Sequence, residues 1–102
     1  MNNVLTKEEI INVLRQQKDL LRTKFYVKTI GIFGSFARNE ATENSDIDFL
    51  VEFDAPLQIY ISNRYSLGDY LQSLFSREVD LANPNSLKPF YKDRILKQAV
   101  YA

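Results

Sequence analysis

The sequence predicts a small α/β domain, with a mixed β-sheet and helices packed on one of its faces. Three runs with the alternation of β-strands, at residues 27–33, 46–53 and 78–81, are separated by segments with helical periodicity. A chain of 102 residues suffices for one modest core and is too short for a second, substrate-binding domain. We therefore expect a single domain over residues 1–102.

Charge and composition exclude several kinds of chemistry. Basic and acidic residues number 13 each, so the net charge is zero and no broad attraction to nucleic acid or membranes is expected. The chain has no cysteine and no histidine, which excludes disulfides, Cys/His zinc sites and imidazole catalysis. It also lacks the apolar core of a signal peptide and any run long enough to span a membrane. We expect a cytoplasmic protein whose bases are carboxylates.

The N-terminal segment is predicted to form one amphipathic helix that covers the sheet. Thr6 and Glu9 have the spacing of a capping box, and apolar residues recur at helical spacing from Ile10 to Leu21. A local basic run, to which the sequence alone assigns no role, consists of Lys18, Arg22, Lys24 and Lys28.

Two further helices are predicted in the second half of the chain. One extends roughly from Ile59 to Ser76. Its predicted buried face consists of Ile61, Leu67, Leu71, Leu74 and Phe75. The other extends from Leu87 to Tyr101, with Pro89 in its first turn.

The tyrosines indicate a partner surface, because a core this small does not accommodate all of them. We expect some to be exposed, as aromatic residues are enriched at interfaces. The candidates are Tyr60, Tyr65, Tyr70, Tyr91 and Tyr101.

A Gly-Ser turn follows the first predicted strand. Gly34 lacks a Cβ, which lets the backbone approach a phosphate closely, and the amide and hydroxyl of Ser35 can donate to that phosphate. The turn is shorter than a P-loop, and neither the P-loop pattern nor Gly-x-Gly-x-x-Gly is present. Arg38 closes the turn, and its guanidinium suits either a carboxylate that fixes the turn or a triphosphate.

Three aspartates supply the candidate metal ligands. Asp46 and Asp48 occupy positions i and i+2 and project to the same face, and Asp80 lies in the third strand, on the face away from its apolar neighbours. Carboxylate oxygens suit Mg²⁺, which takes one or two protein carboxylates plus substrate phosphates. Taken alone, the Gly-Ser pair is also typical of an ordinary turn, and the Asp pair is also typical of the solvated end of a strand. In combination they indicate nucleotidyl transfer.

Three runs of residues together resemble the minimal nucleotidyltransferases of the DNA polymerase β-like superfamily. They are Gly34 to Arg38, Ser45 to Val51 and Val79 to Leu81, and the resemblance covers nearly the whole chain. It implies a polymerase β-like fold, ATP as donor, Mg²⁺ bound by the three aspartates, and nucleotide binding by the Gly-Ser turn and Arg38. One departure is Asn39, where the family usually has glycine. Because asparagine tolerates the left-handed conformation, we expect the turn to persist.

The same resemblance implies a protein partner. Stand-alone members often act as antitoxins that adenylylate a toxin of the HEPN ribonuclease class. We therefore expect AMP transfer to a hydroxyl, that of a tyrosine, on a HEPN-type partner in a hetero-oligomer, without direct binding of nucleic acid. One alternative is a small-molecule nucleotidyltransferase of the antibiotic-modifying kind, although those usually carry a further helical domain. The other is a non-catalytic antitoxin that acts by occlusion.

Overall fold

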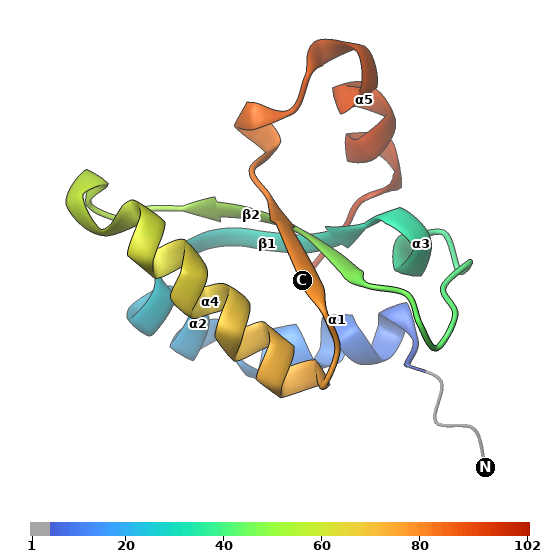
Figure 1. Cartoon of the computed structure of the whole chain (residues 1–102), viewed down its shortest axis with the longest axis horizontal. Coiled ribbons are helices and arrows are strands. Elements are labelled where there is room, and N and C mark those ends of the chain that lie inside the picture. The colour runs from blue at the N-terminus through green and yellow to red at the C-terminus, as the bar shows by residue number, and fades with distance from the viewer. Residues whose placement is uncertain (1–4) are drawn as a thin grey trace.

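The computed structural model describes residues 5–102, which form a four-stranded sheet with helices around it (Figure 1). The strands are β1 (Val27–Phe33), β2 (Ile47–Phe53), β3 (Val79–Ala82) and β4 (Val100–Tyr101). Their order in the sheet is β3-β2-β1-β4. β3 is parallel to β2, whereas β1 is antiparallel to both β2 and β4. The predicted mixed α/β architecture is confirmed.

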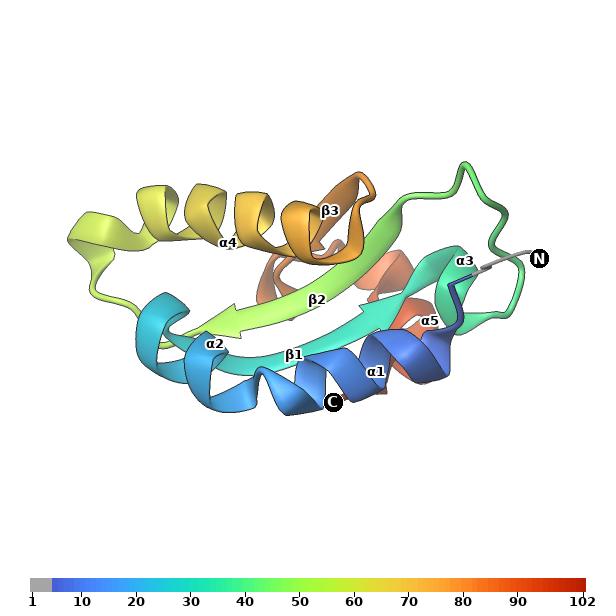
Figure 2. The same cartoon turned by 90° about the horizontal axis from the view of Figure 1, so that it is seen from below.

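The helices lie on both sides of this sheet. They are α1 (Lys7–Gln16), α2 (Lys18–Phe25), α3 (Gly34–Ala37), α4 (Tyr60–Phe75) and α5 (Pro89–Gln98), with 3-10 turns at Leu57–Ile59 and Pro84–Ser86. As predicted, α1, α2 and α4 pack on one face (Figures 1 and 2). Helix α5 differs from the prediction, because it lies on the opposite side of the sheet, where it faces the Gly-Ser turn. Within residues 5–102, none of the helices has both the length and the apolar character needed to cross a membrane.

The hydrophobic core lies between the sheet and the layer of α1, α2 and α4. Ile47, Phe49 and Val51 alternate along β2 and are at most 1% exposed. Burying one side chain of this size contributes about 1.5–3 kcal/mol. Because side chains alternate across a strand, the core residues leave Asp48 on the opposite face, toward α5.

The predicted N-terminal helix is in fact two helices. The capping box is confirmed, with the Glu9 amide donating to Thr6 Oγ1 over 3.2 Å and the Thr6 amide donating to Glu9 Oε1 over 3.0 Å. Gln17, with φ −97° and ψ 8°, separates α1 from α2. The hydroxyl of Tyr70 in α4 donates to Gln17 Oε1 over 2.9 Å, a tertiary contact that periodicity does not reveal.

Helix α4 begins and ends close to the predicted bounds, with Leu67 and Leu71 buried. The prediction that Ile61 is buried is wrong, because its side chain is 70% exposed. Asn63 is buried instead, and its Nδ2 donates to the Phe25 carbonyl over 2.7 Å. This bond satisfies a carbonyl at the end of α2, so the polar residue is retained inside.

The predicted C-terminal helix is correct at its start and wrong at its end. Pro89 is in the first turn of α5, but α5 ends at Gln98 and the next residues form β4, in which Val100 and Tyr101 pair with β1. Gly31 of β1 permits this pairing, because a Cβ there would lie 2.6 Å from the Val100 carbonyl oxygen. The contact with a distant strand overrides local helical preference.

Candidate active site

The Gly-Ser turn packs directly against Asp48. Gly34 has φ +73°, and a Cβ at this position would collide with Asp48 Oδ2. Glycine is therefore required both for the left-handed backbone and for the close approach of the carboxylate. Asn39 has φ 59°, which confirms that asparagine supports the left-handed turn in place of the usual glycine.

The parallel pairing of β2 with β3 places Asp48 opposite Asp80. Desolvation raises the pKa of the Asp48 carboxyl to about 6, helped by the negative charges of Asp80 and Asp46 and by a hydrogen bond with Asp80. The positive charge of Arg38 acts in the opposite direction. The predicted aspartates are thus electrostatically coupled around Asp48, although Asp46 and Asp80 themselves are exposed.

The donor set fits a hard divalent cation such as Mg²⁺. Within residues 5–102, no three acidic side chains converge into a complete metal site, and the mutual repulsion of carboxylates opposes such convergence. After desolvation, the same repulsion is the next cause of the raised pKa of Asp48, and a divalent cation bound by Asp48 and Asp80 would relieve it. Mg²⁺ needs only one or two protein carboxylates, so these two residues could hold it, with Asp46 nearby.

An open cleft of about 540 Å³ adjoins the turn on the side of α5. Its walls include the predicted residues Gly34, Ser35, Arg38 and Asp48. The opposite wall consists of residues that sequence reasoning missed, namely Phe90, Tyr91, Arg94, Ile95 and Gln98. Their helix was predicted, but nothing in its local pattern indicates that it faces a turn more than fifty residues earlier in the chain.

Gln98 links the helix wall to the turn. Its Oε1 accepts from the Gly34 amide over 2.9 Å and from Arg38 Nη1 over 3.0 Å. Arg38 Nε also forms an ion pair with Glu40 Oε1 at 2.9 Å. Arg38 was expected either to pair with a carboxylate that fixes the turn or to bind a triphosphate. The ion pair with Glu40 is the first of these contacts. The Arg38 side chain also lines the cleft.

Arg77 holds the polar loop that precedes β2, and sequence analysis gave it no role. Its Nη1 donates to the carbonyls of Thr42, Glu43 and Ser45, over 3.1, 3.1 and 2.7 Å respectively. The guanidinium also lies over the Phe36 ring, 5.1 Å from its centroid. Arg77 thereby fixes the backbone immediately before Asp46. An arginine preceding β3 gave no local signal for this role.

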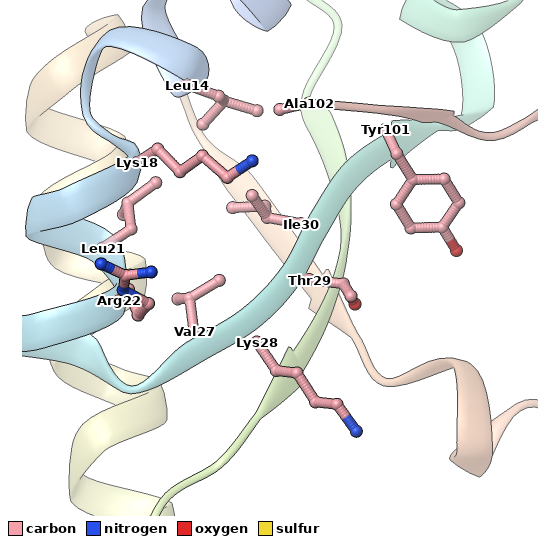
Figure 3. Close-up of a pocket in the computed structure, with 10 residues that line it drawn as sticks. All are labelled: Leu14, Lys18, Leu21, Arg22, Val27, Lys28, Thr29, Ile30, Tyr101 and Ala102. Atoms are coloured by element: carbon pink, nitrogen blue, oxygen red, sulfur yellow. The ribbon is translucent and has the colours of Figure 1, made fainter.

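A second cavity, of about 250 Å³, lies away from the aspartates, between α2 and the edge of β1 (Figure 3). Three residues of the basic run, Lys18, Arg22 and Lys28, surround an apolar floor that includes Leu21 and Val27. None of the predicted site residues lines this cavity. The basic run therefore does not contribute to the cleft beside Gly34.

The raised pKa of Asp48 predicts how the stability of the metal-free protein depends on pH. The folded state binds this proton more tightly than the unfolded state, so the stabilisation is complete below pH 4 and is lost as the pH rises through about 6. We expect the urea midpoint in the presence of EDTA to fall over this window in the wild type. The fall should be smaller in Asp48→Asn. An equal dependence of the urea midpoint on pH in the two proteins would contradict a raised pKa at Asp48.

Comparison with known proteins identifies the family to which this site belongs. Residues 14–102 match the family described as the nucleotidyltransferase domain. Protein adenylyltransferase MntA of Thermococcus cleftensis is 40% identical over 98 residues, which cover 96% of this chain and 97% of that protein.

Solved structures share the fold. One described provisionally as a minimal nucleotidyltransferase superimposes with a TM-score of 0.76 at 26% identity, covering 97% of this chain and 98% of the other. A toxin–antitoxin structure with AMP-PNP gives a TM-score of 0.63 at 26% identity, covering 95% of this chain and 72% of the other.

Proposed function

Because this chain belongs to the nucleotidyltransferase family, we propose that it transfers AMP from ATP to a hydroxyl group of a partner protein. The observation that carries the proposal is the contact of Gly34 with Asp48, which in turn lies opposite Asp80. A phosphate-binding turn and a carboxylate pair meet there. The similarity to a protein adenylyltransferase supports the donor and the acceptor class.

The triphosphate of ATP would lie in the cleft between the turn and α5. The Gly34 amide and Arg38 Nη1 point toward this cleft, since both donate to Gln98 on its far wall. With Ser35 they form a set of donors suited to phosphate oxygens. The related toxin–antitoxin structure with AMP-PNP supports this choice of nucleotide.

In the reaction, the acceptor oxygen would attack the α-phosphorus of ATP, and the bond from that phosphorus to pyrophosphate would break. Asp80, exposed beside Asp48, would take the acceptor's proton. Asp48 and Asp80, with Asp46 beside them, are the residues that would hold Mg²⁺, and the bound ion would lower the pKa of the acceptor hydroxyl and neutralise phosphate charge. Pyrophosphate would leave on the side of Ser35.

A HEPN-type toxin is the proposed partner, and a tyrosine its proposed acceptor. The sequence motifs support this identity, as does the fold shared with a toxin–antitoxin structure. The small size of the described domain also favours a protein acceptor. Residues 5–102 form one sheet with its helices and connecting loops, and a partner protein would supply a further wall around the acceptor.

The proposal is tested by incubating this chain with Mg²⁺, each labelled nucleoside triphosphate, and the protein encoded by the neighbouring gene. We expect label from ATP on the neighbouring protein, and release of pyrophosphate in equal amount. EDTA should abolish both. Labelling of a small molecule such as an aminoglycoside, with the protein unlabelled, would contradict the proposal.

Replacing Gln98 tests the position of the triphosphate. Gln98 occupies two of the donors that ATP would use, so Gln98→Ala should bind ATP about 3- to 10-fold more tightly, by removing the competing hydrogen bonds. Isothermal titration with AMP-PNP measures this change. Lys97→Ala, in the same helix but outside the cleft, is the control. Weaker binding by Gln98→Ala would show instead that Gln98 positions Arg38.

A further inference from the structure

A groove of about 510 Å³ lies between α4 and β3, which are adjacent at one edge of the sheet (Figure 1). It contains Asp80 and none of the residues that line the cleft beside Gly34. Asp48 lines the cleft, and its register partner Asp80 lines the groove. Asp48 and Asp80 share the sheet face away from α4, so the groove reaches this carboxylate pair only at the exposed edge of β3, beside Asp80.

The helix wall of this groove exposes two large side chains. Ile61 and Tyr65 occupy positions i and i+4 of α4, and their residues are 70% and 74% exposed. Neither is needed for the core, and residues four apart on a helix form one continuous surface. An exposed apolar and aromatic pair of this kind is typical of a protein contact.

The other features of the groove restrict what it binds. The Arg64 guanidinium donates to the Leu81 carbonyl, so it occupies a backbone acceptor of the edge strand. An incoming chain would therefore dock through side chains rather than as a fifth strand. Asp69 and Asp80 line the groove as well, and their charges disfavour phosphate groups of RNA or of a second nucleotide.

We propose that this groove binds the acceptor segment of the partner protein. An apolar or aromatic side chain of that segment would contact Ile61 and Tyr65, and this contact would bring the acceptor hydroxyl to Asp80 at the edge of β3, next to Asp48 of the nucleotide cleft. The inference rests on the proposed function, because it assigns the acceptor side of the same reaction.

Two kinds of variant test the groove without touching the aspartates. The double variant Ile61→Ser, Tyr65→Ser removes the exposed pair, and Gly68→Gln fills the groove, since a Cβ at Gly68 meets only Leu81 Cδ1, at 3.9 Å. The control is Leu57→Ser, because this side chain is 88% exposed and lies outside the groove. Circular dichroism and AMP-PNP titration establish that each variant folds and binds nucleotide.

The measurement is binding of the protein encoded by the neighbouring gene, by biolayer interferometry without nucleotide, followed by AMP transfer. We expect both groove variants to weaken binding, and to raise the KM for the partner, about 10-fold or more, with Leu57→Ser unchanged. If the wild type modifies the partner and the groove variants do so equally well, the groove assignment is wrong and the proposed function stands. If the groove variants lose binding but the wild type transfers no AMP, the docking site stands and the proposed function fails. No binding and no transfer by the wild type would overturn both.

Discussion

Asp48→Asn should abolish AMP transfer while leaving the protein folded. Asp48 contacts the turn at Gly34 and lies opposite Asp80, so its loss removes the carboxylate at the centre of the site. We expect the rate to fall at least about 1,000-fold, because metal ligation is worth several kcal/mol in the transition state. Quenched-flow measurement of labelled AMP on the partner checks the rate.

The same variant should be slightly more stable than the wild type in EDTA at pH 7.5. The raised pKa shows that the ionised carboxylate is unfavourable in the folded state, and asparagine removes that charge. After allowance for solvent screening, a gain of about 1 kcal/mol in the free energy of unfolding is expected. Glu43→Gln, in the exposed loop before β2, is the matched control for loss of a charge. If Asp48→Asn is unfolded, Asp48 is a structural residue rather than a metal ligand.

Gly34→Val should be the most damaging substitution in the turn. The new side chain would collide with the Asp48 carboxylate, and a β-branched residue at φ +73° is strained in any surroundings. Together these costs amount to about 2–5 kcal/mol of stability. Chemical denaturation in EDTA should show this loss, and AMP transfer should be undetectable at temperatures where the variant remains folded.

Two milder variants are expected to have smaller effects, one in the turn and one in α4. Ser35→Ala removes one donor of the turn, so its transfer rate should fall only about 3- to 10-fold, with stability nearly unchanged. Gly68→Ala adds a methyl group to a helical glycine where space is available, so it should be stabilising by up to about 1 kcal/mol. A wild-type rate in both Gly34→Val and Ser35→Ala would place the triphosphate elsewhere.

The features of this protein that could be read from sequence are those set by local patterns. The alternation in β2 predicted which face buries Phe49 and which presents Asp48, and the capping box predicted where α1 begins. Gly34 and Asn39 were predicted from the conformations that glycine and asparagine tolerate, and both have positive φ. Each of these features depends on neighbours within a few residues.

The features that sequence missed depend on contacts between distant segments. The break at Gln17 is accompanied by a hydrogen bond from Tyr70, and β4 exists only because it pairs with β1. The contact of Gln98 with Gly34 spans 64 positions, and that of Arg77 with the Ser45 carbonyl spans 32. Periodicity carries no information on such pairs. The sequence therefore did not predict that α5 forms a wall of the cleft, or that Arg77 holds the loop before β2.

The most direct test of the proposed function is intact mass spectrometry of the neighbouring gene's protein, after co-expression with this chain. The wild type should add one or more AMP units to the partner, and tandem spectra should place them on a hydroxyl residue. Co-expression with Asp48→Asn should give the partner without added mass. A partner that remains unmodified with the wild type, yet is inhibited equally by the wild type and by Asp48→Asn, would contradict adenylylation and establish inhibition by occlusion.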